Sequence, residues 1–480
     1  MNNRIIEIDK FNFGEQLLSN IFNIEDIVSS TIVGSFKDKK IFNLKSDIDL
    51  VVVCNKISKK TFEKIIQSVK KTHSKNKSFN IYKLKINKSF GPLKFKLVNT
   101  VVIHLMVYDI NSHIKHVINS PFTCHDWERS KWFKGLKLSK IFQVGTLQIN
   151  DFINSRRGIQ DYISDLKKNV ISYREYKFKN KKIYVNLKKK KINLEDSYEF
   201  SYHIINNLLI NFNKFEKNRN ILLTDVNFKK LFLKITLNDK DLLNKFIFIK
   251  KNKKNKESVK IEDLYSNIII TQKFINYFKR YINTFVNDVN KVTFLRHAKT
   301  KFKKNIFLGQ KINPNINKTK IKFKKNFDIC FTSPMRRSIS TANLLIKKSK
   351  IMIDSNINEI DYGSLEGKDY FFLSKKYPKI IFNWKHKKDT KFPNGENLLD
   401  VSKRLKLFNQ KLLRYNNKYS NILVVTHNVC LRCLIGKNFK VPTYLWYKIK
   451  ISYLDSFNFF IYNNQLRSLI DRKVLYSIIL

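Results

Sequence analysis

The chain has 480 residues and carries 94 Lys and Arg against 38 Asp and Glu, a formal net charge of +56. This length predicts two or three domains rather than one core. Its 43% hydrophobic residues allow large cores, but no apolar run reaches the length of a membrane span. The start turns acidic at Glu7 before any apolar run. We therefore expect no signal peptide, no membrane partner and a cytoplasmic location.

The strong positive charge raises the question of nucleic-acid binding. The basic residues are spread along the whole chain instead of forming one arm. Lys, Asn, Ile and Phe, whose codons are A/T-rich, are abundant, whereas Gly and Pro are scarce. Compositional drift is therefore the favoured explanation, and nucleic acid is a possible partner that the pattern does not favour. Phosphorylated substrates fit both explanations.

The five cysteines are Cys54, Cys124, Cys330, Cys430 and Cys433. Their odd number in a long chain indicates reduced thiols and not a secreted disulfide framework. Cys430 and Cys433 form a C-x-x-C, but it lies in an apolar helical run without a second pair at zinc spacing. Burial as small apolar residues is the expectation for both.

The first segment, residues 1–120, alternates helical and strand patterns. Helices are predicted over Phe11–Ile27 and Thr61–Thr72, and strands over Ser30–Val33, Asp47–Val53 and Asn99–Asp109. Asp47 and Asp49 point to the same side of their strand. Such a pair can hold Mg²⁺ together with phosphate oxygens. Gly34 and Ser35, just after the first strand, would offer N–H groups and a hydroxyl to a triphosphate.

This pattern of Gly-Ser, a loop and Asp-x-Asp resembles the nucleotidyltransferase superfamily of DNA polymerase β, which uses two-metal nucleotidyl transfer. The resemblance implies an α+β nucleotidyltransferase-like domain over 1–120. Gly34 and Ser35 would bind a nucleoside triphosphate, and Asp47 and Asp49 would bind Mg²⁺. The family usually has a third acid on a later strand. His104 stands where that acid is expected, and Asp109 at the strand end is an uncertain substitute. A non-catalytic nucleotide- or RNA-binding module is therefore an open alternative.

The second segment, residues 121–288, is predicted to be a mostly helical middle domain, the kind of segment that commonly helps bind substrate in that superfamily. Helices are predicted over Asp151–Asn169, Leu194–Phe215 and Ile261–Phe285, and Lys-rich runs interrupt them at Lys177–Lys191 and Lys250–Lys256. The second run is expected to be a solvated loop. His113, His116 and His125 are interpreted as ordinary loop or helix-end residues, because no cysteine cluster accompanies them.

The third segment, residues 289–480, alternates strands and helices again. Strands are predicted over Val292–Leu295, Ile329–Phe331, Ile351–Ile353 and Asn421–Thr426. Helices are predicted after the second strand, with Pro334 just inside the helix and Ser333 as its cap, and after the fourth strand. This alternation favours an α/β fold with a parallel sheet between helices, a three-layer α/β/α domain.

Strand ends in this segment deliver Arg296 and His297, then Arg337, then His427 to the crevice where α/β sheets bind ligands. Two guanidinium groups, a second imidazole and helix N-termini suit a phosphate. The neutral imidazole of His297 can attack phosphorus. Glu359 is the best candidate for a general acid.

Five segments in this order resemble the histidine phosphatase superfamily, the phosphoglycerate-mutase-like fold. They are Leu295–Thr300, Ser333–Ala342, Glu359–Gly367, Pro393–Glu396 and Val424–Asn428. The resemblance implies that His297 is the phosphorylated nucleophile and Glu359 the proton donor. It also implies that Arg296, Arg337 and His427 bind the phosphoryl group, and that the reaction needs no metal cofactor.

The segment departs from that family at a few positions near the site. Ala298-Lys299 replaces the common Gly-Glu, Asn428 replaces a Gly, and Asn305 with the adjacent lysines is the nearest match to the usual Asn and Arg. The domain is short, so a phosphomonoesterase acting on a phosphorylated small molecule is preferred over phosphoglycerate-mutase-type phosphotransfer. Together with the first segment, this predicts a bifunctional phosphate-ester enzyme.

Overall fold

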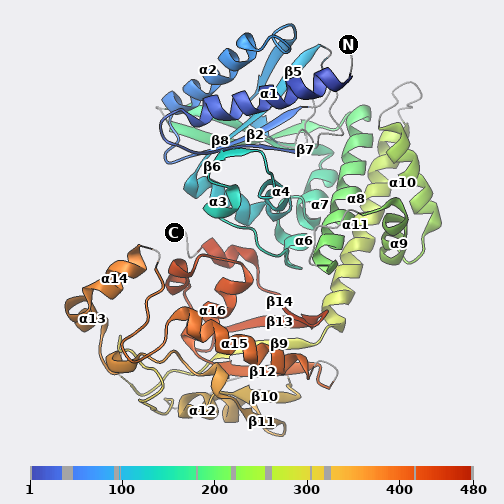
Figure 1. Cartoon of the computed structure of the whole chain (residues 1–480). Coiled ribbons are helices and arrows are strands. Elements are labelled where there is room, and N and C mark those ends of the chain that lie inside the picture. The colour runs from blue at the N-terminus through green and yellow to red at the C-terminus, as the bar shows by residue number, and fades with distance from the viewer. Residues whose placement is uncertain are drawn as a thin grey trace. The chain divides into compact units, whose positions relative to one another are not determined.

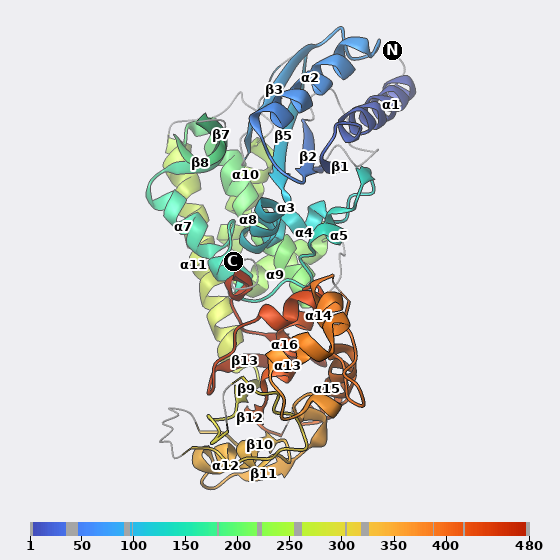
Figure 2. The same cartoon turned by 90° about the vertical axis from the view of Figure 1, so that its left-hand side faces the viewer.

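The computed structural model describes residues 3–34, 47–90, 97, 99–179, 182–217, 223–253, 262–302, 305–317, 326–386, 388–415 and 418–476. The chain divides into two compact units, residues 1–147 with 151–281, and residues 148–150 with 282–480. Figures 1 and 2 show the elements of both from two sides. The predicted boundary near residue 120 falls inside the first unit, and the three-domain division stays a prediction.

A five-stranded mixed sheet in the order β3-β5-β2-β1-β6 lies at the centre of the first unit. Its strands are β1 (Ile27–Val33), β2 (Ile48–Cys54), β3 (Lys83–Asn87), β5 (Thr100–Asp109) and β6 (Phe133–Gly135). β2 is antiparallel to β1 and parallel to β5. Near-continuous apolar runs in β2 and β5 are typical of central strands that are buried on both faces.

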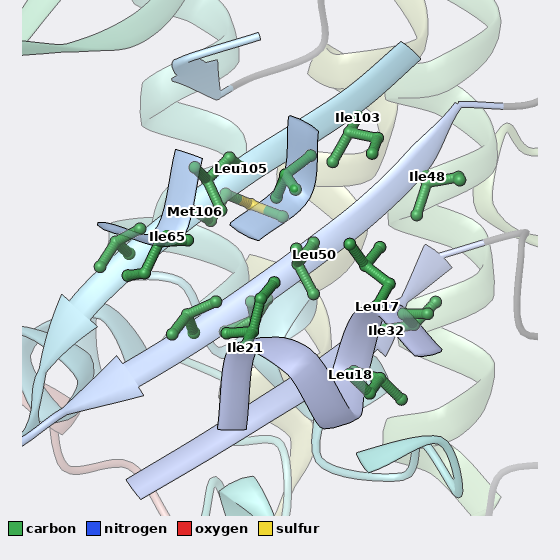
Figure 3. Packing of buried hydrophobic residues seen from close by; sticks show 14 of the residues in the cluster. Leu17, Leu18, Ile21, Ile32, Ile48, Leu50, Ile65, Ile103, Leu105 and Met106 are labelled. Atoms are coloured by element: carbon green, nitrogen blue, oxygen red, sulfur yellow. The ribbon is translucent and has the colours of Figure 1, made fainter. Parts of the chain in front are cut away.

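Helices α1 (Asn3–Phe22) and α2 (Lys59–Lys75) pack on this sheet. Leu17 and Ile21 of α1 lie close to Leu50 of β2 in Figure 3. In the sheet, Leu50 is the cross-strand partner of Leu105. Full burial of a leucine or isoleucine stabilises the fold by about 1.5–3 kcal/mol. The helix predicted to continue to residue 27 ends at residue 22, because residues 27–29 belong to β1.

The rest of the first unit is mostly helical. Its helices are α3 (Ile110–Asn119), α4 (Pro121–Trp127), α5 (Leu138–Ile141), α6 (Asp151–Asn154), α7 (Ile159–Lys167), α8 (Leu194–Lys217), α9 (Asp225–Ile235), α10 (Lys240–Asn252) and α11 (Glu262–Asp288), whose last residues lie in the second unit. A small sheet adds β4 (Ser89–Phe90), β7 (Val170–Lys179) and β8 (Lys182–Lys191).

One helix prediction for this region was wrong. Residues 151–169 form no single helix, because the chain breaks between α6 and α7, where Arg157 has a φ of 60°. The first Lys-rich run, for which no element was predicted, contributes its described residues, 177–179 and 182–191, to the antiparallel hairpin β7–β8. Within the other Lys-rich run, Lys250–Asn252 end α10, whereas residues 254–256 lie outside the described part of the chain.

The second unit is built on a six-stranded sheet in the order β11-β10-β12-β9-β13-β14. Its strands are β9 (Lys291–Arg296), β10 (Ile329–Thr332), β11 (Lys350–Ile353), β12 (Asn421–Thr426), β13 (Ser456–Tyr462) and β14 (Gln465–Ser468). The four predicted strands, β9 to β12, are parallel, which confirms the predicted parallel sheet. β13 is an unpredicted antiparallel neighbour of β9.

Helices cover both faces of this sheet. Leu295 and Leu423 on one face share a buried cluster with Ala342 of α12. On the other face, Phe294 packs with its ring centroid 6.4 Å from that of Phe408 of α15. Neighbouring residues of a strand point to opposite faces, so α12 and α15 lie on opposite sides. The helices are α12 (Arg336–Leu345), α13 (Tyr370–Lys376), α14 (Pro378–Lys385), α15 (Leu398–Leu413), α16 (Asn428–Asn438), and the 3₁₀ turns η2 (Ser355–Ile357), η3 (Gly363–Leu365), η4 (Thr443–Lys448) and η5 (Arg472–Leu475).

Across the described residues, every helix is too short or too polar to cross a membrane.

Candidate active site

The carboxyl ends of β9, β10 and β12 align at one edge of the second unit's sheet. Arg296 at the end of β9 is the cross-strand partner of Thr426 at the end of β12. His297 and His427 are the next residues along each strand, and their ring centroids lie 5.0 Å apart. The parallel pairing thus brings together two histidines that are 130 positions apart in the sequence.

His297 is held in one tautomer. Its Nδ1 lies 2.7 Å from the carbonyl oxygen of Ala298. Because a carbonyl only accepts, Nδ1 carries the hydrogen and Nε2 keeps its lone pair. Burial, together with the charges of Arg337 and Arg296, lowers the pKa of His297 to about 3, although the Ala298 hydrogen bond acts in the opposite direction. The imidazole is therefore neutral at neutral pH.

His427 is fully buried, and both of its nitrogens are engaged. Nε of Arg337 donates to its Nδ1 at 3.3 Å. Its Nε2 therefore carries the hydrogen and donates to the hydroxyl of Ser333 at 2.7 Å, with Ser338 at 3.2 Å. Burial and the neighbouring Arg337 hold the pKa of His427 well below its usual range. The predicted cap role of Ser333 was wrong, because Met335 is the N-cap residue of α12, without a side-chain cap.

Arg337 has no exposed surface, and a loop holds its guanidinium group in place. Nη2 donates to the carbonyl of Gly309 at 2.7 Å and Nη1 to that of Ile312 at 3.4 Å. The carboxylate of Glu366 accepts the backbone N–H groups of all four loop residues, 309–312, at 2.7–3.2 Å. Glu366 thus fixes the loop that fixes Arg337.

Arg296 presents a donor that lacks an acceptor. Its Nη1 donates to the carbonyl of Ile451 at 2.6 Å, and its guanidinium lies 3.9 Å from the ring centroid of Tyr453. Its Nε is buried without a hydrogen-bond partner among the described residues. Since a buried donor without an acceptor costs free energy, this N–H is suited to an anionic ligand.

The side chain of Glu359 contacts the N-terminus of α16, a helix that begins at Asn428. Its Oε1 accepts the N–H groups of Ile360 at 3.0 Å and of Val429, in the first turn of α16, at 3.1 Å. Arg404 holds the same segment by donating to the carbonyl of Glu359 at 3.0 Å. Arg404 is itself held by a two-point ion pair with Glu396, at 2.8 and 3.0 Å.

The segments that begin at Glu359 and Pro393 meet at two glycines. Gly363 has a φ of +55°, and a Cβ there would lie 2.0 Å from the carbonyl oxygen of Pro393. A Cβ at Gly395 would lie 2.4 Å from the carbonyl oxygen of Asp361. Only glycine permits so close an approach of the two backbones.

The sequence pattern missed several residues around the site. Glu366, Ser338 and Arg404 were given no role, although the first two lie inside segments that resemble the family. Tyr453 precedes β13 and had no sequence signal. Asn305, a candidate for the early loop, is exposed with a φ of +61°, and the adjacent lysines lie outside the described residues.

The second predicted site lies in the first unit. Gly34 has a φ of +73°, and a Cβ there would lie 2.1 Å from Oδ2 of Asp49. Asp49 is the cross-strand partner of His104, whose Nε2 lies 2.9 Å from Oδ2 of Asp47. The structure thus brings together Gly34, Asp47 and Asp49 next to His104. Ser35 is outside the described residues.

His104 stands at the position where the nucleotidyltransferase pattern leads one to expect a third acid. Nδ2 of Asn87 donates to its Nδ1 at 2.7 Å, so Nε2 carries the hydrogen and donates to Asp47. Burial would lower the pKa of His104, but Asp47 and Asp49 outweigh it and raise that pKa. Asp109 caps α3 through Ser112 instead, five residues further along the strand.

No group of three or more His, Cys, Asp or Glu side chains in the described residues is arranged to hold a metal ion. His113, His116 and His125 are buried on α3 and α4. Cys430 and Cys433 are buried free thiols, as predicted.

Comparisons with known proteins match the second unit. Residues 292–469 fit the model of the histidine phosphatase superfamily (branch 1). The 2,3-bisphosphoglycerate-dependent phosphoglycerate mutase of Buchnera aphidicola subsp. Cinara cedri is 30% identical over 188 residues, covering 30% of this chain and 82% of that enzyme. The protein of the same description from Methylobacterium sp. (strain 4-46) is 31% identical over 116 residues, covering 23% of this chain and 56% of that enzyme.

Among solved structures, the alpha-ribazole phosphatase from Shigella flexneri is 19% identical with a TM-score of 0.34, covering 38% of this chain and 96% of that one. The chain spans 56% and 54% of the length of two further curated relatives. The family model and the Buchnera aphidicola mutase, which is covered over 82% of its length, match the same part of the chain. Through its second unit, the chain belongs to the histidine phosphatase superfamily.

Proposed function

We propose that the second unit is a phosphomonoesterase that acts through a phosphohistidine intermediate at His297. The observation that carries this proposal is the state of that imidazole: neutral, held by Ala298 through Nδ1, with Nε2 lacking a partner among the described residues. A neutral imidazole nitrogen beside two arginines and a second histidine is suited to attack a phosphate ester.

In the first step, Nε2 of His297 forms a bond to phosphorus while the bond from phosphorus to the leaving oxygen breaks. Arg296 and Arg337 stabilise the negative charge on the non-bridging oxygens, and the buried Nε of Arg296 gains its acceptor. His427 binds the phosphoryl group by turning the hydrogen on its Nε2 from the hydroxyl of Ser333 to a non-bridging oxygen. The carboxyl group of Glu359, whose Oε1 is occupied by two N–H groups, passes a proton from Oε2 to the leaving oxygen.

In the second step, Glu359 accepts a proton from a water molecule that attacks the phosphohistidine. The bond between phosphorus and Nε2 breaks, phosphate leaves, and His297 returns to its neutral state. The alternative is mutase-type transfer, in which a hydroxyl group of a phosphoglycerate takes the place of water. Two of the relatives carry that description, whereas the short domain favours water.

The test is hydrolysis of an aryl phosphate by the full chain in the presence of a chelator. We expect His297→Ala to abolish both turnover and the acid-labile radiolabel that phosphohistidine would carry. The matched control is His386→Ala, because His386 is exposed in the same unit. Activity that is sensitive to the chelator and survives His297→Ala would refute the proposal. Release of free phosphate from a phosphoglycerate separates hydrolysis from mutase-type transfer.

For the first unit, we propose nucleotidyl transfer as a second function, supported by Gly34 lying against Asp49. Asp47 and Asp49 would hold Mg²⁺, which would neutralise charge on a nucleoside triphosphate. His104 favours the rival function, which is binding of a nucleotide or RNA without transfer. It donates a hydrogen bond to Asp47, one of the two carboxylates, and it occupies the position where a third carboxylate is expected.

Transfer of radiolabel from [α-³²P] nucleoside triphosphates in Mg²⁺ separates these two functions. We expect Asp47→Asn and Asp49→Asn to abolish transfer, and Asp225→Asn, on the surface of α9, to leave it unchanged. Nucleotide binding without transfer that depends on Asp47 or Asp49 supports the rival. Absence of both binding and transfer overturns both functions for this unit.

A further inference from the structure

A cluster of buried polar atoms in the first unit lacks hydrogen-bond partners among the described residues. The cluster comprises Oη of Tyr108, both ring nitrogens of His113, Nε2 of His116 and Oγ of Ser120. Each of these side chains is at most 6% exposed. The ring centroids of Tyr108 and His116 are 5.1 Å apart, and those of Tyr108 and His113 are 6.0 Å apart. Most buried polar groups of native proteins are paired, so a concentration of unpaired ones indicates a ligand.

Three arginines lie around this cluster. Arg156 and Arg157 follow α6, and the N–H of Arg156 donates to the carbonyl of Asn119, the residue before Ser120, at 2.8 Å. Arg174 of β7 holds its guanidinium 5.0 Å from the ring centroid of Phe90. Within the described part of the chain, the three guanidinium groups form no ion pair and no hydrogen bond. All three side chains are partly exposed, so a ligand can reach them.

The charges of these arginines act on one another and on the cluster. Burial and the nearby Arg156 lower the pKa of Arg174 to about 10. Burial and the charges of Arg174 and Arg156 hold the pKa of His116 well below its usual range. Asp161 is the carboxylate that acts on Arg174, and it already accepts the backbone N–H of Arg157 at 2.8 Å. An excess of guanidinium charge remains, which suits a phosphate dianion better than a carboxylate monoanion.

We propose that the first unit binds a phosphate group through Arg156, Arg157 and Arg174, with hydrogen bonds to the Tyr108 cluster behind them. This site is separate from the carboxylates near Gly34. Tyr108 is four residues beyond His104 on β5, roughly 13 Å along an extended strand. The ligand is inorganic phosphate or the phosphate group of a larger molecule, and the proposal does not depend on nucleotidyl transfer.

The test uses the full chain with Arg296→Gln and His297→Ala, which removes phosphate binding at the second unit. Equilibrium dialysis with ³²P-labelled inorganic phosphate should show one saturable site. Arg156→Gln should weaken this binding by about tenfold or more, the effect of losing one charge-assisted hydrogen bond. The matched control, Arg280→Gln on α11, removes an exposed arginine of the same unit and should leave binding unchanged.

Further variants and competitors keep the result decisive. Arg174→Lys keeps the positive charge but loses the planar set of guanidinium N–H donors. It should therefore weaken phosphate binding while the melting temperature stays close to that of the parent chain. Tighter binding of AMP than of phosphate, with the same dependence on Arg156, supports a larger phosphorylated ligand. The proposal is overturned by the absence of a saturable phosphate site, by equal losses in Arg280→Gln, or by acetate, a carboxylate monoanion, competing as well as phosphate.

Discussion

Replacing Glu366 by Gln tests whether the geometry of Arg337 depends on the loop that holds it. The carboxylate of Glu366 accepts four backbone N–H groups from residues 309–312. The same loop offers the carbonyls of Gly309 and Ile312 to Arg337. Glutamine has the same size but lacks the charge, and its amide group turns a donor toward part of this row of donors.

The expected magnitude follows from these contacts. A hydrogen bond to a charged group contributes about 1.5–3 kcal/mol, and a buried donor left without an acceptor costs about 1–3 kcal/mol. The amide oxygen of glutamine keeps part of the set, and water can reach the N–H of the exposed Lys311. We therefore expect Glu366→Gln to lower the free energy of unfolding by about 2–3 kcal/mol. Misplacement of Arg337 should lower kcat/KM by roughly 10- to 100-fold.

The assays are urea denaturation and steady-state hydrolysis of an aryl phosphate, with inorganic phosphate as a product inhibitor. Inhibition by phosphate should weaken together with kcat/KM, because the proposed role of Arg337 is to bind the phosphoryl group of the substrate and free phosphate alike. Glu63→Gln is the matched control, since Glu63 forms an exposed ion pair with Lys59 at 3.8 Å. A folded Glu366→Gln variant with unchanged kcat/KM and unchanged phosphate inhibition would show that Arg337 does not need the loop.

Three further predictions concern the second unit. Ser333→Ala removes an acceptor of the His427 Nε2 hydrogen and should lower kcat/KM by about tenfold, with little change in melting temperature, in steady-state kinetics. Gly363→Ala places a Cβ against the carbonyl oxygen of Pro393 at a positive φ and should cost about 2 kcal/mol or more in urea denaturation. The folded-state pKa of His297, about 3, lies below its ordinary 6.5, so the unfolded chain binds more protons between these values. This contribution to stability should be complete above pH 6.5 and lost as the pH falls toward 3, and His297→Gln should flatten the measured pH dependence.

Much of the second unit could be predicted because its strands are short apolar runs that end abruptly in polar residues. Phe294 and Leu295 are followed by Arg296, so both the strand and its functional end are visible in the sequence. β13 was missed, although Phe459 and Phe460 lie in it, because nothing local shows that it pairs antiparallel with β9. Pairing partners are decided by tertiary packing, which a single strand does not reveal.

The residues that orient the site were harder to predict than those that would carry the chemistry. Ser333 precedes a proline and a helix, a pattern of helix caps, yet its hydroxyl accepts from His427. Glu366 and Arg404 act on backbone groups of distant segments, so their own surroundings in sequence give no sign of it. In the first unit, the described residues of the run 177–191 form strands without an apolar face that burial would mark, since Tyr184, Val185 and Leu187 of β8 are all exposed.

The position of β9 within its sheet has a consequence for the dynamics of the unit. Hydrogen bonds to β12 on one edge and β13 on the other engage this strand on both sides. Backbone amides in such a strand exchange with solvent only through openings close to global unfolding. The amides of Val292 to Leu295 should therefore be among the slowest to exchange with deuterium. The proposed nucleophile at residue 297 follows this strand directly, so its backbone position should persist until the whole unit unfolds.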